Sequence, residues 1–503
     1  MKTITFTKLG LCASLILISA TAAIFAQTGG ASQGEPQTTK GAVIKGKAPV
    51  NRTVLRVKLP KAQEATLKNG LHVVVLERNK VPTFSMEMVV LSGGLSDASD
   101  KRGLASVTAA LLREGTASHN SREIAEQLDT LGATVAANSG LNSFTTNINA
   151  AGLVENFDQV LALFSEVIRA PKFPAEELDK FKSRTSSLLQ FSRSQAAFLA
   201  QERLAQAIYG NHPAATVSQP IEVLKKLTTA DLAQFQAANY LPNNSILFVV
   251  GDVRLKEVLP KIEAAFADWK GGTAPQLSIP AIPAQSASRI QLINRPGSVQ
   301  TVFQIGSLGI ERTDPDYVAL AVMNRILGGG ASSRLFLNIR EDKGYAYSVG
   351  SSFNSSKYRG TFVASSPVRT EVTEGTLHEF MAEFKRIREE KVSPVELDNA
   401  KRAIVGQFAL ALENPQSLLQ NIITQKLYSL PVDYWDTYPQ KVEAITAEDV
   451  QRVARKYLDL EHLQIVAVGD AAKTREVLAK FGHLEVYDTD GKLVAAAGQK
   501  ANP

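Results

Sequence analysis

The chain has 503 residues, a formal net charge of +6 and a single cysteine, Cys12. Cys12 lies in an N-terminal apolar segment that we expect to be removed, so disulfides and thiol catalysis are excluded for the mature protein. The excess positive charge is concentrated before Val54. The rest of the chain is near neutral and has no basic stripe, which argues against a nucleic-acid-binding protein.

Residues 1–26 have the layout of a secretory signal peptide. Lys2 and Lys8 precede an apolar run that extends from Leu9 to Ala26 and ends in small residues. A membrane anchor is the alternative, but polar residues and a glycine interrupt the run, which is marginal for crossing about 30 Å of hydrocarbon. We therefore expect cleavage after Ala26 or Ala23, a periplasmic or secreted mature protein, and no stable membrane span.

Two further segments are predicted to lie outside the folded body. Residues 27–53 are rich in Gly, Gln, Thr and Pro, which is typical of a flexible lead-in, and a second polar tail is expected at 488–503. The stretch between them is too long for one ordinary core and indicates several domains.

This body contains two copies of one unit. The sequence at 227–232 leads to an apolar run at 246–250, and a similar sequence at 445–450 leads to another run at 465–468, at an offset of about 218 residues. A proline-rich stretch separates the copies. We therefore predict an N-terminal domain at 54–273, a linker at 274–284 and a C-terminal domain at 285–487.

In the first copy, the apolar runs at 71–76 and 84–91 are bounded by Asn-Gly and Gly-Gly, which predicts adjacent strands joined by a turn-rich connection. The apolar spacing from Leu104 to Leu112 then predicts a helix directly after a strand. Further helices are expected at 121–132, 153–168 and 175–206.

The second copy repeats this order, with strands expected at 290–293 and 301–307 and a helix at 315–327. Such a mixture of strands and helices indicates the α+β class. We expect two homologous domains, each a mainly antiparallel sheet with helices covering one face.

Residues 103–116 follow the frame in which inverzincin peptidases carry H-x-x-E-H, but the reactive residues are missing. The flanking glycines set the register, so the two histidine positions fall at Ser106 and Ala110 and the general-base position at Ala109. A zinc hydrolase needs two imidazoles one helical turn apart and a carboxylate that deprotonates the metal-bound water. Hydroxyl and methyl side chains can do neither.

With these features the body resembles the insulinase/pitrilysin-like peptidase family, in its processing-peptidase branch. Residues 66–71 resemble the family's opening strand, 103–116 its metal helix and 326–349 its second-half signature. The resemblance implies that two similar domains form one half of a clamshell, and that two halves enclose a chamber in which peptides are cut. One half carries zinc, and the other can contribute an arginine and a tyrosine seven residues apart.

The resemblance also places a third zinc ligand, a glutamate, near Ser187, but this chain has no Asp or Glu between Asp179 and Glu202. His119 and Glu123 have ligand-like spacing, which we interpret as a solvated helix start. We therefore predict no metal and no cofactor in this chain. No two of its histidines share one helical turn; they are His72, His119, His212, His378, His462 and His483.

The arginine and tyrosine of the family signature are present as Arg340 and Tyr347. A guanidinium and a phenol can both donate a hydrogen bond to a peptide carbonyl oxygen and stabilise the oxyanion that forms when water attacks. The structural alternative is that Arg340 caps a helix end or pairs with a carboxylate while Tyr347 packs on a strand. Tyr345 is a nearby competitor, although the seven-residue spacing favours Tyr347.

Three glycines, Gly328, Gly329 and Gly330, precede this pair. No Lys-Ser or Lys-Thr follows at the spacing of a phosphate-binding loop, so a nucleotide site is not expected. Glycine allows backbone to approach backbone closely. From the resemblance to the family's glycine-rich loop, we expect these residues to contact a bound peptide or a neighbouring chain.

These features predict the non-zinc subunit of a heterodimeric zinc peptidase. Its partner would be a homologous chain that holds the zinc, its substrates would be peptides, and neither nucleic acid nor a membrane is expected as a partner. The alternative is a catalytically inactive scaffold or peptide-binding protein of the same fold. A peptidase with relocated metal ligands is the third and least favoured interpretation.

Overall fold

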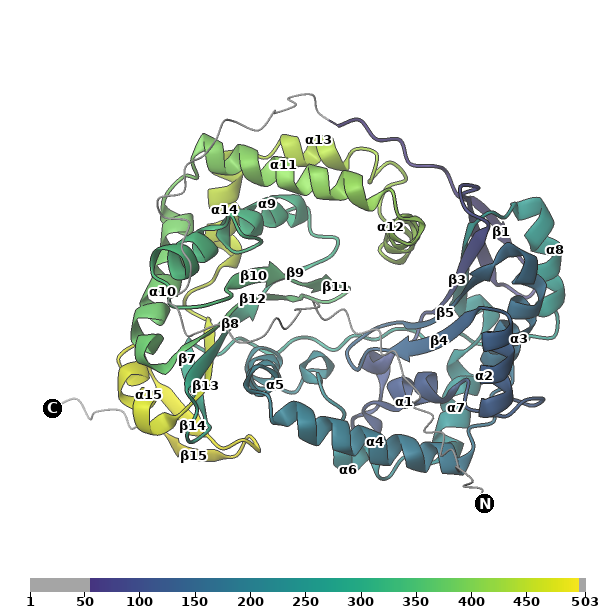
Figure 1. The fold of residues 1–503 in the computed structure, drawn as a ribbon, viewed down its shortest axis with the longest axis horizontal. Coiled ribbons are helices and arrows are strands. Elements are labelled where there is room, and N and C mark those ends of the chain that lie inside the picture. The colour runs from purple at the N-terminus through teal and green to yellow at the C-terminus, as the bar shows by residue number, and fades with distance from the viewer. Residues whose placement is uncertain (1–54, 497–503) are drawn as a thin grey trace, which may run out of the picture. The chain divides into compact units, whose positions relative to one another are not determined.

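The computed structural model describes residues 55–496 of the chain (Figure 1). The signal peptide predicted at 1–26 and the lead-in predicted at 27–53 therefore lie outside the described residues. Among the helices between residues 55 and 496, none combines the length and the apolar character needed to cross a bilayer.

A six-stranded sheet is the centre of the first domain. Its strands are β1 (Gln63–Thr66), β2 (His72–Glu77), β3 (Thr83–Val90), β4 (Thr134–Ser139), β5 (Thr146–Leu153) and β6 (Ser245–Gly251). They are ordered β1-β2-β6-β3-β5-β4, and every neighbouring pair is antiparallel except β2 and β6.

Strand β6 lies between β2 and β3, which the sequence predicted to be adjacent, and that prediction was wrong. On β6, Leu247 and Val249 belong to one buried cluster, while Phe248 and Val250 belong to another on the opposite face. A strand that is apolar on both faces is stable only inside a sheet that is covered on both sides. The continuous apolar run of β6 therefore occupies an interior place, and the two earlier strands flank it.

The second domain repeats this arrangement. Its main sheet contains β7 (Arg289–Asn294), β8 (Gln300–Leu308), β10 (Gly350–Phe353), β12 (Thr361–Arg369), β13 (Gln464–Gly469), β14 (Leu484–Tyr487) and β15 (Leu493–Ala496), in the order β10-β12-β8-β13-β7-β14-β15. The strands β7, β13, β8, β12 and β10 have the same neighbours and relative directions as β2, β6, β3, β5 and β4. A small parallel pair joins β9 (Ile310–Glu311) to β11 (Ser355–Ser356).

The helices complete both domains. In the first half they are α1 (Leu104–Leu111), α2 (Ser121–Thr130), α3 (Phe157–Arg169), α4 (Ala175–Arg193), α5 (Ala196–Tyr209), α6 (Ile221–Leu224), α7 (Thr229–Asn239) and α8 (Leu255–Ala265). In the second half they are α9 (Tyr317–Leu327), α10 (Thr373–Glu389), α11 (Pro394–Ala411), α12 (Pro415–Leu427), α13 (Tyr438–Glu443), α14 (Ala447–Tyr457) and α15 (Ala471–Ala479). The predicted α+β fold with two homologous domains and mainly antiparallel sheets is confirmed.

The repeated sequence at 227–232 and 445–450 begins a helix in each domain. Thr228 precedes α7 and Thr446 precedes α14, and each threonine hydroxyl accepts the backbone N–H of the aspartate three residues later. The aspartate carboxylate accepts the threonine backbone N–H in return. Such a capping box satisfies backbone donors that the first helical turn leaves without partners.

The single helix predicted at 175–206 is two helices in the structure. The chain leaves helical geometry between Arg193 and Ala196, where the Ser194 hydroxyl donates to the carbonyl oxygen of Phe191 at 2.7 Å. A serine hydroxyl that bonds to a nearby carbonyl competes with the helical ladder. The break separates α4, which stays with the first domain, from α5, which packs on the second.

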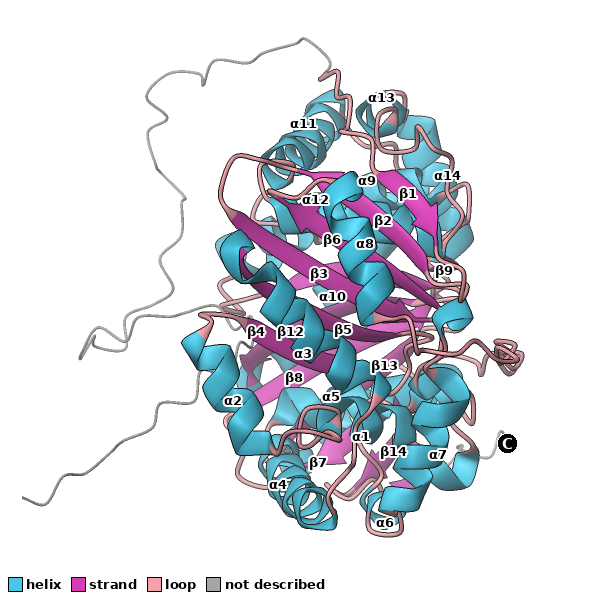
Figure 2. Cartoon of the chain, turned by 90° about the vertical axis from the view of Figure 1, so that its right-hand side faces the viewer, coloured by secondary structure: helices cyan, strands magenta, loops and turns pink. Residues whose placement is uncertain are grey.

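Each domain places one helix on the other domain's sheet (Figure 1). Helix α5 lies on β8 and β13, where Leu204 and Ile208 share a buried cluster with Val468. Helix α12 lies on β6, where Leu419 shares a buried cluster with Phe248. Figure 2 shows α3 and α8 lying across the other face of the first sheet. Each sheet is therefore covered by its own helices on one face and by a helix of the other domain on the second face.

The polar tail predicted at 488–503 begins instead as part of the second sheet. The Asp488 carboxylate accepts the backbone N–H groups of Asp490 and Lys492 at 3.0 and 2.8 Å, which closes a turn. Strand β15 then pairs antiparallel with β14. The short apolar run that begins at Leu493 was not predicted as a strand. The predicted linker at 274–284 contains neither helix nor strand.

Glu87 is a buried carboxylate on the face of the first sheet that α12 covers. The residue is 2% exposed, and its Oε2 accepts a hydrogen bond of 2.8 Å from Nε2 of Gln420 on α12. Burial raises the pKa of Glu87 from 4.5 to about 6, although the hydrogen bond from Gln420 opposes this rise. The native state therefore holds this proton to a higher pH than the unfolded chain does.

We expect Glu87→Gln to raise the free energy of unfolding by about 2 kcal/mol above pH 7 and to change it little below pH 4.5. Because the native pKa is raised, ionisation of Glu87 destabilises the fold as the pH increases from about 4.5 to 6, and an amide cannot ionise. Urea denaturation at several pH values measures the difference. Glu263→Gln, at an exposed position of α8, is the control, and equal effects of the two variants would contradict the assignment.

Candidate functional site

Arg340 and Tyr347 lie together in the structure. Arg340 is on the π-helix Phe336–Asp342, and its guanidinium carbon lies 5.0 Å from the centre of the Tyr347 ring and 4.7 Å from that of Phe336. A guanidinium is attracted to the faces of aromatic rings, so the two contacts orient Arg340. The Arg340 side chain is 32% exposed and Tyr347 is 67% exposed, which keeps both accessible to a ligand.

The neighbours of Arg340 and of Tyr345 show which tyrosine pairs with the arginine. The Arg340 Nε lies 3.6 Å from the carboxylate of Glu341, which is the kind of pairing that the structural alternative for Arg340 expected. Tyr345 lies against α10 instead, since a methyl group added at Gly375 would come within 3.0 Å of its ring. Tyr347 is therefore the tyrosine that contacts the arginine.

Three carboxylates hold the π-helix against α10 and α11, and we call Glu379, Glu383 and Glu396 the acidic clamp. Just before the π-helix, Arg334 is 6% exposed and donates two hydrogen bonds, of 2.7 and 3.2 Å, to Glu396. Within it, Asn338 Nδ2 donates to Glu379 at 2.9 Å and to Glu383 at 3.0 Å. A π-helix is rare and commonly occurs at functional sites. Here, contacts with α10 and α11 hold the chain at Arg334, just before the π-helix, and at Asn338, within it.

The clamp carries negative charge at neutral pH. Burial alone would raise the pKa of Glu396, but hydrogen bonds from the Arg334 guanidinium and from Ser393 outweigh burial and lower it to about 2. Burial is likewise outweighed at Glu379, whose pKa is lowered by Asn338 and by Lys343, with Lys343 Nζ 3.0 Å from the carboxylate. These charges compensate the cations on and beside the π-helix.

The glycine loop follows α9 and approaches β10 closely. Ser351 donates its backbone N–H to the carbonyl oxygen of Gly328 at 3.0 Å, and a methyl group at Gly328 would lie only 2.4 Å from the Ser351 nitrogen. A methyl group at Gly329 would lie 2.9 Å from the Arg325 backbone, and one at Gly330 would lie 2.7 Å from the Arg325 guanidinium. Close approach of the backbone therefore requires glycine at positions 328 and 329, whereas the Arg325 side chain could move away from a larger residue at position 330. Contact with a peptide or neighbouring chain stays a prediction.

The positions of the degenerate zinc motif lie on α1. Ala109, where the family has its general base, is 1% exposed and forms part of the interior, whereas Ser106 and Ala110 are partly exposed. The helix begins where the Asp97 carboxylate accepts the backbone N–H groups of Gly103 and Ala105 at 2.8 and 3.2 Å. Burial raises the pKa of Asp97 to about 7 despite these bonds. The motif therefore keeps its helix but has no group that binds metal.

No other metal site replaces it in the described part of the chain, where no three His, Cys, Asp or Glu side chains are grouped as ligands. Ser187, near the expected third ligand, lies on an exposed face of α4 and donates its hydroxyl to the Ser183 carbonyl oxygen.

A helix begins beside His119, as we interpreted the sequence, but His119 itself contacts another helix. The His119 Nδ1 lies 3.1 Å from the carboxylate of Glu166 on α3, and the Thr116 hydroxyl donates to the same carboxylate. Glu123 instead closes a capping box with Asn120 at the start of α2. His119 and Glu123 therefore form no ligand pair. The partner on α3 is distant in sequence, which is why the spacing alone did not predict it.

Sequence reasoning found the arginine and tyrosine but missed the residues that hold them. Asn338 and the acidic clamp were not predicted. One signal was present: Glu379 and Glu383 are four residues apart and so share one face of a helix. Nothing local indicated that this face would meet Asn338.

The comparisons with known families agree with this geometry. Residues 73–220 match the family model "Insulinase (Peptidase family M16)" and residues 226–404 match the model "Peptidase M16 inactive domain". The chain belongs to the M16 peptidase family. It is a homologue of zinc peptidases whose own metal motif is degenerate.

The matches between this M16 chain and its relatives cover nearly the full length of those relatives. It is 25% identical over 403 residues to "Uncharacterized zinc protease YmxG" of Bacillus subtilis, which covers 78% of this chain and 94% of the relative. It is 23% identical to "Non-peptidase homolog YmxG" of Helicobacter pylori, which covers 80% and 93%. The crystal structure of a peptidase M16 inactive domain from Pseudomonas fluorescens matches with a TM-score of 0.76 and 28% identity, over 81% of this chain and 98% of that one.

We expect Arg334→Met to lower the free energy of unfolding of this M16 chain by about 2–3 kcal/mol at pH 7, because it leaves the Glu396 carboxylate without its cation. The loss should disappear as the pH falls toward 2, where Glu396 becomes protonated and the wild type loses the same contribution. Urea denaturation measures both effects. The control is Arg402→Met, whose partner Asp398 on the same helix is 55% exposed, and it should cost less than about 0.5 kcal/mol. Equal losses would contradict the role of the clamp.

We also expect the purified M16 chain to bind no stoichiometric zinc and to hydrolyse no peptide by itself. Elemental analysis and a quenched-fluorescence peptide assay measure these properties. The triple variant Ser106→His, Ala109→Glu, Ala110→His should still fail, because the distal carboxylate and the groups that orient zinc ligands stay absent. A chelator-sensitive activity of the chain alone that survives removal of contaminating peptidases would overturn this expectation.

Proposed function

We propose that this M16 chain is the non-zinc subunit of a two-chain zinc peptidase and that it acts on peptides bound between the two chains. The observation that supports this role is the contact between Arg340 and Tyr347, both accessible and held on a clamped π-helix. The zinc belongs to the partner, a homologous chain with an intact H-x-x-E-H motif. In this proposal the glycines Gly328, Gly329 and Gly330 contact the bound peptide or the partner.

The proposed chemistry uses only the donors of these two residues. The Arg340 guanidinium and the Tyr347 hydroxyl donate hydrogen bonds to the carbonyl oxygen of the scissile peptide. As water attacks, negative charge develops on that oxygen, and donors already oriented toward it stabilise the transition state more than the ground state. The aromatic contacts of the guanidinium and the clamp of the π-helix favour this pre-orientation.

The proposed localisation, the periplasm or the exterior of the cell, is supported by the sequence alone. A cleaved signal peptide at residues 1–26 directs the chain to the periplasm or outside the cell, and the zinc-bearing partner would need a signal of the same kind. A partner encoded without one could not meet this chain in that compartment.

The second candidate is a catalytically inactive scaffold or peptide-binding protein of the same fold. The Helicobacter pylori relative, which bears the name "Non-peptidase homolog", favours it. The two candidates differ in assembly: the subunit forms a complex with a zinc-bearing M16 chain, whereas the scaffold forms homodimers or stays alone. Size-exclusion chromatography with mass measurement after co-expression separates them.

We expect Arg340→Ala and Tyr347→Phe each to reduce kcat of the reconstituted two-chain peptidase by about 10²–10³. Arg340→Lys should recover only part of the loss, because an ammonium lacks the planar fork of donors. Zinc content and assembly should be unchanged. The matched controls are Tyr345→Phe, whose ring lies against α10, and Arg122→Ala, an exposed arginine of α2.

The same experiment can reject the catalytic role. If Arg340→Ala and Tyr347→Phe leave kcat unchanged in a complex that contains zinc and cleaves peptides, the pair is structural. A reduction in kcat that accompanies loss of assembly would assign the pair to the interface between the chains instead.

A further inference from the structure

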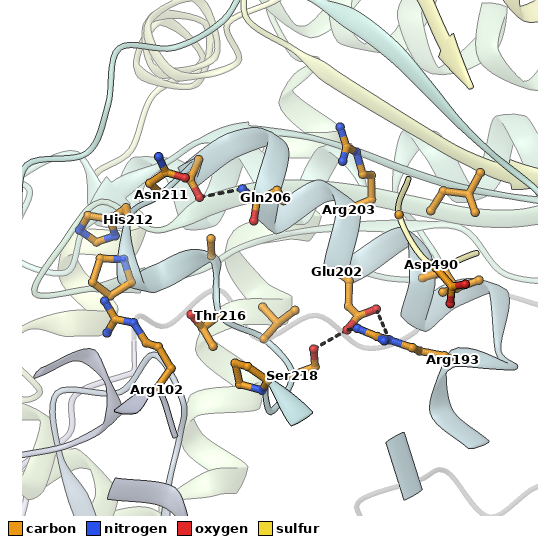
Figure 3. A pocket seen from close by; sticks show the side chains of 18 of the residues that line it. Arg102, Arg193, Glu202, Arg203, Gln206, Asn211, His212, Thr216, Ser218 and Asp490 are labelled. Atoms are coloured by element: carbon orange, nitrogen blue, oxygen red, sulfur yellow. Dashed lines mark hydrogen bonds and ion pairs between the residues drawn. The ribbon is translucent and has the colours of Figure 1, made fainter. Parts of the chain in front are cut away.

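A cavity of about 650 Å³ opens beside α5, away from the arginine and tyrosine pair (Figure 3). Its walls are α5, the loop at 210–220 that follows α5, and the turn at 489–491 between β14 and β15. Arg102, which lies just before α1, forms part of the side away from Asp490. Segments from both domains therefore build one cavity, and its volume is within the range of about 300–1,000 Å³ that is typical of ligand sites.

Two of the charges in this cavity neutralise each other. Arg193 donates two hydrogen bonds to Glu202, of 3.2 and 3.3 Å, and the Ser218 hydroxyl donates to the same carboxylate. Figure 3 shows these contacts on one side of the cavity. Glu202 is therefore saturated by its own neighbours, and the pair adds no net charge to the site.

Arg203 is held against the second domain. Its guanidinium carbon lies 3.6 Å from the centre of the Tyr487 ring, and its Nε donates to the side chain of Gln291. These contacts fix Arg203 at the wall of the cavity, where it contributes a positive charge.

Arg102 is the arginine whose donors are not satisfied. Its Nη1 is buried and has no hydrogen-bond partner among the described residues. Figure 3 shows its side chain pointing toward His212. The His212 ring cannot accept from it, because Nδ1 already accepts the backbone N–H of Ala214 and Nε2 lies 3.0 Å from the carbonyl oxygen of Pro280.

The Asp97 carboxylate does not hydrogen-bond to the Arg102 guanidinium either. Asp97 interacts with Arg102 electrostatically, but its carboxylate accepts the backbone N–H groups of Gly103 and Ala105. Arg102 therefore lines the cavity without a carboxylate hydrogen-bonded to its guanidinium in the described part of the chain, and such a guanidinium can donate charge-assisted hydrogen bonds to an anionic ligand oxygen.

We propose that this cavity binds the free C-terminal carboxylate of a peptide, with Arg102 as its anchor. This site requires neither zinc nor a partner chain, and it shares no residue with the proposed site at Arg340 and Tyr347.

The charge of the cavity selects a monoanion. Its lining contains three arginines against Glu202 and Asp490, and His212 is neutral, which leaves one net positive charge. A carboxylate matches that charge and accepts the planar fork of a guanidinium. A dianionic phosphate would keep an excess negative charge in the cavity.

The rest of the lining suits the body of a peptide. Leu199, Val217 and Ile293 provide apolar surface, while Asn211 and Thr216 provide amide and hydroxyl groups that can hydrogen-bond to peptide groups. A ligand that consisted only of an anion would leave this surface unused.

The test compares N-acetyl-tetraalanine as the free acid with its C-terminal amide, using calorimetric titration against the full purified chain at low salt. The free acid should bind at least about tenfold more tightly, because the amide removes the charge-assisted hydrogen bonds. Arg102→Gln should abolish this preference. Asn211→Asp, an exposed change that adds a negative charge beside the cavity, should weaken binding of the acid without disturbing the fold.

The control variant is Arg122→Gln on the exposed surface of α2, which should bind the acid like the wild type. Equal binding of acid and amide would overturn the proposal, and so would no binding of either peptide. Displacement of the acid by inorganic phosphate would show a general anion site instead. Because these titrations contain no zinc and measure no cleavage, their failure would leave the proposed function at Arg340 untouched.

Discussion

The exchange of one helix between the domains is the contact on which the rest of the fold depends. Helix α5 covers the second sheet and α12 covers the first, and each buries apolar side chains on the second face of the sheet. Burial of apolar area is the main stabilising contribution to folding. Neither sheet could stay exposed on that second face in water, so the two domains stabilise each other and form a single folded body.

This exchange also determines where polar groups lie. Glu87 is buried because α12 lies over it, and the cavity beside Arg102 exists because α5 crosses from one domain to the other. The π-helix is held by polar contacts as well as by apolar packing. Ile339 is buried in the core of the second domain, while hydrogen bonds from Arg334 and Asn338 to the acidic clamp attach the π-helix to α10 and α11. Such contacts are directional, so they fix the orientation of a short helix more closely than apolar side chains could.

Patterns in the sequence predicted the features that depend on residues close together in the chain. The repeated threonine and aspartate that begin α7 and α14 revealed the duplication, and the spacing of Arg340 and Tyr347 indicated a pair that the structure brings into contact. The place of β6 could not be read in this way, because strand pairing joins segments far apart in the chain. The contact between Arg334 and Glu396 joins residues that are 62 positions apart, and the break between α4 and α5 falls at residues 194–195. Neither has a periodic signal.

The interior position of β6 has a consequence for the order in which the protein can fold. As the chain is synthesised, β2 and β3 emerge early, but the strand that joins them comes about 160 residues after β3. The first sheet cannot close before residue 251, and its second face has no cover until α12 is made. The nascent chain therefore exposes apolar strands through most of its synthesis. Transiently exposed apolar strands of this kind favour aggregation until α12 covers them.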